Sequence, residues 1–142
     1  MKVGIGNDHA GFSYKNSIKA HIAKAGHQIV DFGTNSIDSA DYPDYAHPLA
    51  SNITEKKIDI GILICGSGNG VCMTANKHPE TRAALCWNGQ VAFLARRHNN
   101  ANVICIPARF VALELALEMI DVFLNTEFES GRHQRRVEKI CI

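Results

Sequence analysis

The segment that most constrains the fold is residues 58–65, IDIGILIC, a nearly continuous apolar run. Such a run indicates a strand whose sheet is covered by helices on both faces, which places it centrally in a parallel sheet. A glycine-rich loop follows directly, and then a short helix-compatible stretch that ends near Lys77. The loop consists of Gly66, Ser67, Gly68, Asn69 and Gly70. A strand, a glycine loop and a helix in this order can bind an anion through backbone N–H groups.

The rest of the chain alternates between predicted strands and predicted helices. Further strands are expected at residues 2–6, 28–32, 83–86 and 103–106. Helices are expected at residues 12–25, 44–56 (with Pro48 in the first turn), 90–97 and 112–125, and a short one in the polar tail after Ser130. Because parallel neighbours need crossover connections, residues 1–142 should form one three-layer α/β/α, Rossmann-like domain with a five-stranded parallel sheet. Ligands should then bind at the carboxyl ends of the strands.

The composition argues against several classes of partner. The 142 residues are 46% hydrophobic and 20% charged, and no stretch approaches the roughly 20 apolar residues of a membrane span. Fifteen Lys and Arg nearly balance fourteen Asp and Glu, so no overall positive field favours a nucleic acid or an anionic membrane. The N-terminus has no signal-peptide core, and the five cysteines are an odd number in a chain that needs no cross-links. We therefore expect a cytoplasmic protein with reduced thiols, and Cys141 in an exposed tail.

Cys65 is the first candidate for chemistry because it ends the central strand and opens the glycine loop. Nearby unpaired N–H groups and a helix N-terminus should lower the pKa of its thiol; the alternative is a buried cysteine that acts as a small apolar side chain. The loop could hold a small oxyanion or could simply be a tight turn. Nucleotide and phosphatase loops fail on spacing, because Val71 stands where a final glycine or an arginine would be needed.

Other candidates lie at the predicted strand ends. Asp8 and His9 follow the first strand and Tyr42 lies in the loop after the second; the alternatives are an N-cap beside a surface histidine and a residue that packs the loop. His98 and Asn99 precede the last strand, so they should lie at the opposite edge of the sheet from the predicted pocket. Either they play no part in that pocket, or a second subunit delivers them to it.

Arginines and lysines complete the set of candidates. Arg109 follows the last strand, and Arg132 and Arg136 are four residues apart on one face of the tail helix. Together they could clamp a phosphate, or the tail could be a solvated face. Lys15, Lys19 and Lys24 are expected on the solvated face of the first helix.

Six motifs in order along the chain together resemble the ribose-5-phosphate isomerase B family. They are NDHAG at 7–11, DYPDYA at 41–46, GILICGSGNG at 61–70, ANK at 75–77, RHNNANV at 97–103 and GRHQRRV at 131–137. The resemblance implies a metal-independent enzyme without a cofactor that interconverts ribose 5-phosphate and ribulose 5-phosphate in the non-oxidative pentose phosphate pathway. It also implies a homodimer with shared active sites, with a tetramer as an alternative assembly.

The resemblance also assigns roles to the candidates. Cys65 matches the catalytic base and His98 the residue that assists ring opening. The substrate-binding positions are matched by Asp8, His9, Tyr42, Asn99, Arg109, Arg132, Arg136 and residues 66–70, where Ser67 stands in place of the threonine of many relatives. Two alternatives stay open: an isomerase of a six-carbon substrate such as allose 6-phosphate or galactose 6-phosphate, and a non-catalytic nucleotide-binding α/β module.

Overall fold

The structure is a computed structural model that describes residues 1–140, so Cys141 lies outside the described residues. Its elements are β1 (Lys2–Asn7), η1 (His9–Gly11), α1 (Phe12–Lys24), β2 (Gln28–Asp31), α2 (Pro43–Thr54), β3 (Ile60–Cys65), α3 (Asn69–Ala75), β4 (Ala83–Leu85), α4 (Gly89–Asn99), β5 (Val103–Pro107), α5 (Leu113–Asn125) and α6 (Arg132–Glu138). The strands form one five-stranded sheet in the order β2-β1-β3-β5-β4. Each neighbouring pair is parallel. The predicted parallel α/β fold is therefore confirmed.

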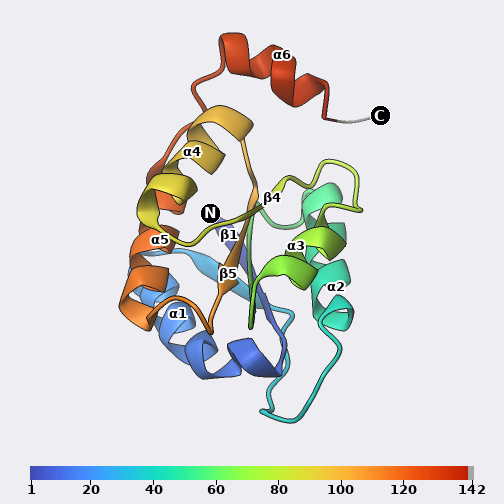
Figure 1. The fold of residues 1–142 in the computed structure, drawn as a ribbon, viewed down its shortest axis with the longest axis vertical. Helices are drawn as coiled ribbons and strands as arrows, with labels where there is room; N and C mark the ends of the chain where they lie inside the picture. Colours follow the sequence, from blue (N-terminus) through green and yellow to red (C-terminus); the bar gives the residue numbers. More distant parts are fainter. Residues whose placement is uncertain (141–142) are drawn as a thin grey trace.

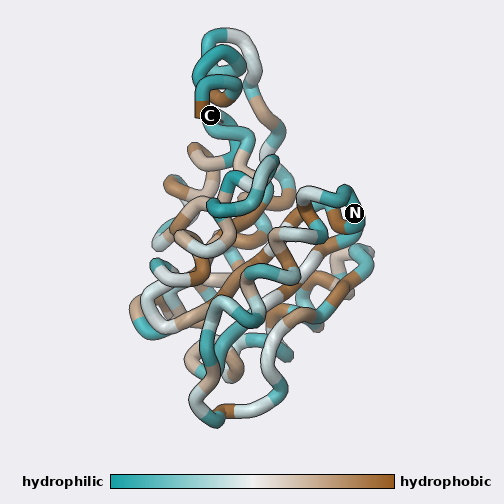
Figure 2. The backbone as a smooth tube through the Cα atoms, turned by 90° about the vertical axis from the view of Figure 1, so that its right-hand side faces the viewer, coloured by the Kyte–Doolittle hydropathy of each residue, from teal (hydrophilic) through white to brown (hydrophobic). Residues whose placement is uncertain are grey.

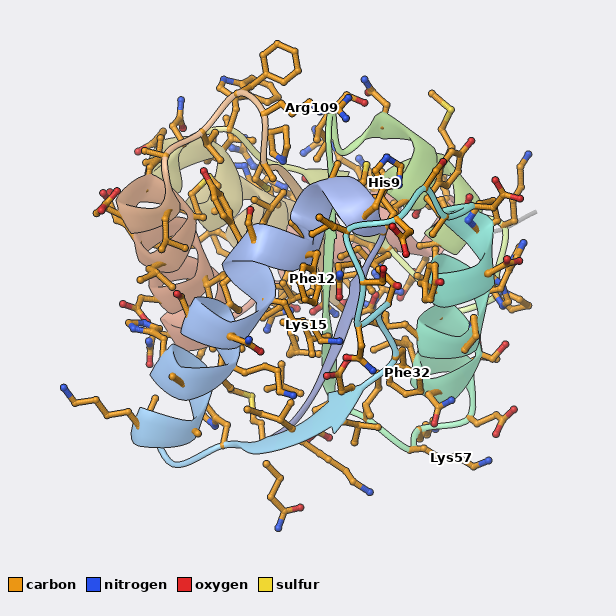
Figure 3. The ribbon with its side chains drawn as sticks, turned by 90° about the horizontal axis from the view of Figure 1, so that it is seen from below. His9, Phe12, Lys15, Phe32, Lys57 and Arg109 are labelled. Carbon is orange, nitrogen blue, oxygen red and sulfur yellow. The ribbon has the colours of Figure 1, made fainter. Side chains whose placement is uncertain are left out.

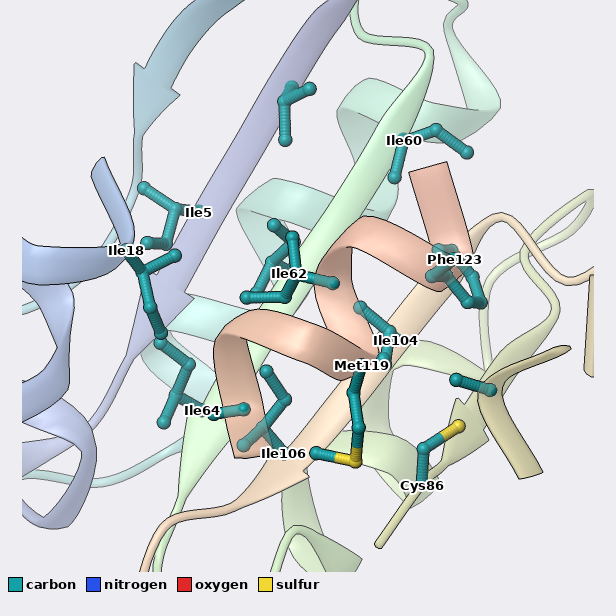
Figure 4. Packing of buried hydrophobic residues seen from close by; sticks show 14 of the residues in the cluster. Ile5, Ile18, Ile60, Ile62, Ile64, Cys86, Ile104, Ile106, Met119 and Phe123 are labelled. Atoms are coloured by element: carbon teal, nitrogen blue, oxygen red, sulfur yellow. The ribbon is translucent and has the colours of Figure 1, made fainter. Parts of the chain in front are cut away.

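Helices cover both faces of the sheet (Figure 1). One apolar cluster joins the sheet to α1, α4 and α5, with Ile62, Ile104 and Phe123 among its buried members (Figure 4). A second cluster joins the other face to α2 and α3. In Figure 2 the hydrophobic stretches run through the middle of the molecule, while α6 projects from one end as a mostly hydrophilic arm. The arm contacts α4.

Strand β3 is the central strand of the sheet. All six of its residues are buried, because helices cover it on both faces, and this is why its sequence is a nearly continuous apolar run. The observed strand begins at Ile60 rather than at residue 58. The prediction for Pro48 was wrong: α2 starts at Pro43, so Pro48 lies inside the helix rather than in its first turn. Pro43 stands in the first turn instead, where its fixed φ and missing N–H fit a helix start. Among residues 1–140, none of the helices is long and apolar enough to cross a membrane.

The prediction that Lys15 is solvated was wrong. Its side chain is 1% exposed, and Nζ lies 2.9 Å from Asp31 Oδ1. Nζ also donates to the carbonyl oxygens of Gly33 and Thr34 and to Asn35 Oδ1, at 3.3, 3.0 and 2.8 Å. Lys15 therefore ties α1 to the start of the loop that follows β2, and Figure 3 shows its side chain directed toward that loop.

Lys15→Met tests how much this buried ammonium group stabilises the fold. We expect the free energy of unfolding to fall by about 2–3 kcal/mol, because the loop carbonyls and one carboxylate oxygen lose a buried partner. Lys19 reaches the same carboxylate at 2.8 Å but is 35% exposed, so Lys19→Met should cost under about 1 kcal/mol. Urea denaturation of the two variants measures both values, and equal losses would contradict the structural role given to Lys15.

Candidate active site

A cavity of about 360 Å³ opens at the carboxyl ends of the strands. Its lining residues are Asp8, His9, Ala10, Tyr42, Cys65, Gly66, Ser67, Gly70, Arg109 and Phe110. Figure 3 looks toward this end of the molecule, with His9 and Arg109 on the near side. A second cavity of about 320 Å³ is lined by none of the residues predicted from the sequence. The candidates predicted at the carboxyl ends of the strands therefore meet in this cavity.

Cys65 is the last residue of β3 and is 4% exposed, yet it lines the cavity. The backbone N–H of Gly68 donates to its sulfur at 3.1 Å. Burial raises the pKa of the Cys65 thiol, and Asp8 raises it further; N–H groups of Val71, Gly68 and Ser67 lower it by less. The expected lowering of this pKa was therefore wrong, because desolvation outweighs the N–H donors.

The raised pKa predicts how activity depends on pH if the thiolate is the reactive form. A thiol whose pKa is raised stays protonated near neutral pH, so its ionised fraction grows about tenfold per pH unit until the pKa is reached. We therefore expect kcat/KM, which reports ionisations of the free enzyme, to rise with pH above neutrality. Initial rates on ribose 5-phosphate between about pH 7 and pH 10 measure this limb. A flat profile would show that the titration of Cys65 does not control the reaction.

The glycine loop turns the chain from β3 into α3. Gly68 has a φ of +75°, a left-handed conformation that favours glycine, and a Cβ there would lie 2.4 Å from the Leu85 side chain. The N–H of Asn69 donates to the Ser67 hydroxyl at 3.3 Å. Gly68 and Asn69 thus shape the loop, whereas Gly66, Ser67 and Gly70 face the cavity.

Asp8 and His9, which follow β1, both line the cavity, and Asp8 is also an N-cap. Asp8 caps η1, since its Oδ1 accepts from the N–H groups of Ala10 and Gly11 at 2.9 and 3.2 Å, and it also lines the cavity. His9 beside it lines the cavity as well, and its Nδ1 accepts from the N–H of Ala40 at 3.1 Å.

Tyr42 and Arg109 approach the glycine loop from two sides. A Cβ built on Gly70 would lie 2.5 Å from the Tyr42 ring, and one built on Gly66 would lie 3.0 Å from the Arg109 guanidinium group. The backbone N–H of Arg109 donates to the Gly66 carbonyl at 3.1 Å. These close approaches place an aromatic ring and a cation at the two ends of the loop.

The structure does not bring the other four candidates to this cavity. His98 and Asn99 end α4, just before β5 begins, and Arg132 and Arg136 lie on α6, which packs against α4. These elements are at the amino edge of the sheet, at the top of Figure 1, whereas the cavity is at the carboxyl edge. Arg109 is therefore separated within one chain from the two arginines expected to share its phosphate.

His98 belongs to a cluster of its own. Its ring stacks on that of His133, with centroids 4.1 Å apart and planes at 10°. His133 is 6% exposed, and within the described residues its Nε2 has no hydrogen-bond partner. Burial lowers the pKa of His133, and His98 and Arg132 lower it further.

The atoms of His98, Glu129 and His133 that could bind a metal ion lie within 4.8 Å of one another. However, Glu129 is already paired with Arg97 at 2.9 Å, and that hydrogen bond lowers the pKa of the carboxyl group. Parallel stacked rings also direct their in-plane lone pairs side by side rather than toward one point. The three residues are therefore poorly arranged to hold a metal ion together.

Two residues near these sites were not predicted from the sequence. Phe110 lines the cavity although it is 77% exposed, and His133 holds the His98 ring by stacking. Phe110 follows Arg109 directly after β5, so the rule that ligands bind at strand ends could have included it. The signal for His133 was weaker, because its partner comes from a helix far away in the sequence.

Comparisons with known proteins agree with this architecture. The family model described as Ribose/Galactose Isomerase matches residues 3–140. Ribose-5-phosphate isomerase B of Escherichia coli (strain K12) is 43% identical over 139 residues, which cover 98% of this chain and 93% of that protein. The solved structure of a ribose 5-phosphate isomerase from Thermotoga maritima has a TM-score of 0.95 and 45% identity, over 98% of this chain and 96% of that one.

A further solved structure contains a bound ligand. Ribose-5-phosphate isomerase B of Mycoplasma genitalium, solved with ribulose-5-phosphate, has a TM-score of 0.95 and 44% identity, over 98% of this chain and 93% of that one. The matches span almost the full length of both proteins in each comparison. On these grounds the chain belongs to the ribose/galactose isomerase family.

Proposed function

We propose that this protein interconverts ribose 5-phosphate and ribulose 5-phosphate through an enediolate intermediate. The observation that carries the proposal is the position of Cys65, a thiol facing a cavity beside a glycine loop in a chain 43–45% identical to isomerases of this type. The relatives are named ribose-5-phosphate isomerase B, and one was solved with ribulose-5-phosphate; this supports a five-carbon substrate for this chain rather than allose 6-phosphate or galactose 6-phosphate.

Cys65 is the proposed base. Its thiolate takes the proton from carbon 2 of the open-chain aldose, and the C–H electron pair forms the C1–C2 double bond as the carbonyl oxygen becomes negatively charged. A proton then moves from the oxygen on carbon 2 to the oxygen on carbon 1, the thiol returns its proton to carbon 1, and the carbonyl forms at carbon 2. One base that reaches both carbons is therefore sufficient for the proton transfer between the carbons.

The charge that develops on the sugar oxygens needs fixed donors. We assign this role to the N–H groups of the loop at residues 66–70, of which Gly66, Ser67 and Gly70 line the cavity, whereas the N–H groups of Gly68 and Asn69 donate to Cys65 Sγ and Ser67 Oγ. Asp8, His9 and Tyr42 are proposed to contact the sugar, and Arg109 to bind the phosphate. Binding of the unreacting phosphate then holds carbons 1 and 2 beside the sulfur.

The remaining residues are proposed to come from a second copy of the chain. His98 would open the sugar ring, Asn99 would contact the substrate, and Arg132 and Arg136 would complete the phosphate site, each in the partner's cavity. Exposed large apolar side chains support a homodimer of this kind: Phe110, which lines the cavity, is 77% exposed, and Met73 and Trp87 are 65% and 54% exposed. We keep a tetramer as the alternative assembly.

We also propose that residues 1–142 form one isomerase domain, as a single sheet and a family match over 3–140 support. A cytoplasmic location is proposed as well, and it is compatible with the free thiols of Cys65, Cys72, Cys86 and Cys105.

Turnover on matched sugar phosphates tests the proposal. We expect kcat/KM for ribose 5-phosphate to exceed that for allose 6-phosphate and galactose 6-phosphate by about 100-fold, since a longer sugar must fit the same distance between base and phosphate site. Preference for either six-carbon substrate would overturn the substrate assignment. Absence of isomerisation, with stabilisation by ATP but not by sugar phosphates in thermal melting, would indicate a nucleotide-binding module instead.

A further inference from the structure

We infer that the loop after β2 fixes His9 as a neutral hydrogen-bond donor whose proton is on Nε2. The identity of the oxygen that receives this hydrogen bond rests on the proposed function, whereas the position of the proton follows from the protein alone. His9 is thereby assigned to substrate binding rather than to proton abstraction.

The proton position follows from one hydrogen bond. The backbone N–H of Ala40 points at His9 Nδ1, with 3.1 Å between the two nitrogens. A backbone N–H can only donate, so Nδ1 must accept through its lone pair and carries no proton. The single proton of the neutral ring is then on Nε2.

This tautomer decides what His9 can do in the cavity. His9 lines the cavity, and with Nδ1 occupied by Ala40, Nε2 is the ring nitrogen left for a ligand. A protonated Nε2 donates to an oxygen with lone pairs, such as a phosphate, carbonyl or hydroxyl oxygen, but it cannot take a proton from carbon. Cys65 then has no competitor from this imidazole for the role of base.

The loop that carries Ala40 is attached to the rest of the protein at both of its ends. Lys15 binds the loop at Gly33, Thr34 and Asn35, as described above. Gly33 packs so closely that a Cβ there would lie 1.8 Å from Asn7 Oδ1. The other end of the loop runs into α2 at Pro43, so the segment that carries Ala40 is anchored on both sides. Lys15 and Ala40 are positioning residues in this scheme, and neither side chain lines the cavity.

Nitrogen NMR of the full chain labelled with ¹⁵N-histidine tests the tautomer directly. At about pH 9, above the ordinary titration range of histidine, we expect His9 Nδ1 to resonate as an unprotonated nitrogen and Nε2 as a protonated one. The chain has seven histidines, and loss of one spin system in His9→Gln identifies the signal. A protonated Nδ1, or a mixture of tautomers, in the wild-type protein would overturn the inference.

Substitutions at Ala40 test whether its backbone N–H fixes the tautomer of His9. Ala40→Gly keeps the backbone N–H and should keep the single tautomer. Ala40→Pro removes the N–H, and the His9 signals should then show both tautomers in exchange. If the proline variant is folded and still shows the wild-type tautomer, another group sets the proton position and the inference about the loop is wrong. If it does not fold, the wild-type and glycine spectra still decide the tautomer.

Two nearly isosteric side chains test the donor role. His9→Gln places an amide N–H near the position of Nε2, whereas His9→Glu places an acceptor there. We expect KM for ribose 5-phosphate to rise roughly 10- to 100-fold more in His9→Glu than in His9→Gln, with a smaller change in kcat. Equal effects would overturn the donor role. A confirmed tautomer in a protein without isomerase activity would leave the proton position standing and reject the proposed function.

Discussion

Cys65→Ala is expected to lower kcat for ribose 5-phosphate isomerisation by roughly 10³- to 10⁴-fold, the upper part of the range for loss of a general base. The methyl group cannot accept a proton; of the other groups that line the cavity, Asp8 Oδ1 already accepts two backbone N–H groups of η1 and His9 Nδ1 accepts the N–H of Ala40. Cys65→Ser should be similarly impaired, because a hydroxyl group is a much weaker acid than a thiol and stays protonated. Coupled assays of ribulose 5-phosphate formation measure both variants.

The controls separate lost chemistry from lost structure. Cys65→Ala removes one buried sulfur atom, so the free energy of unfolding should fall by no more than about 1–2 kcal/mol. Stabilisation by ribose 5-phosphate in thermal melting should persist, because the proposed phosphate and sugar contacts remain. Near-normal turnover in a folded Cys65→Ala protein would reject the assignment of Cys65 as the base.

The fold could be predicted because its main signals are local. Within the apolar run predicted as a strand at 58–65, residues 60–65 formed the buried central strand, and the cavity candidates came together because parallel strands end at the same edge of a sheet. The position of His98 at the other edge was predictable by the same rule, since it precedes the last strand. The topology of one chain could not predict how a second copy would bring its His98 to the cavity of Cys65.

The two errors in physical chemistry have a common cause in burial. Lys15 precedes Ile18 by three residues and Ile22 by seven, so helical spacing placed it on the buried face of α1. Its positive charge led to the prediction that it is solvated. The acceptors of its hydrogen bonds lie on the loop after β2, and the spacing of residues in the sequence does not show that this loop lies beside α1. For Cys65, the loop indicated N–H donors but not the desolvation that outweighs them.

Mixing two inactive variants is expected to restore activity if the site is shared between two copies. Cys65→Ala and His98→Asn should each be nearly inactive as homodimers. In a heterodimer, one cavity combines the intact Cys65 of one chain with the intact His98 of the other, while the second cavity carries both lesions. Random reassociation makes half of the dimers heterodimers, so about a quarter of wild-type activity should return in a two-fold symmetric assembly.

Pairs of lesions from the same half of the site provide the matched control. Cys65 and Arg109 line one cavity, so a mixture of Cys65→Ala and Arg109→Met leaves every cavity with one lesion and should not recover. His98→Asn mixed with Arg136→Met should not recover for the same reason, since both side chains would be delivered to the partner's cavity from α4 and α6 of one chain. Differently tagged chains allow heterodimers to be isolated before the assay. Isolated heterodimers of Cys65→Ala and His98→Asn without activity would show that the partner's His98 does not serve the cavity of Cys65, and the arm formed by α6 would then need another role.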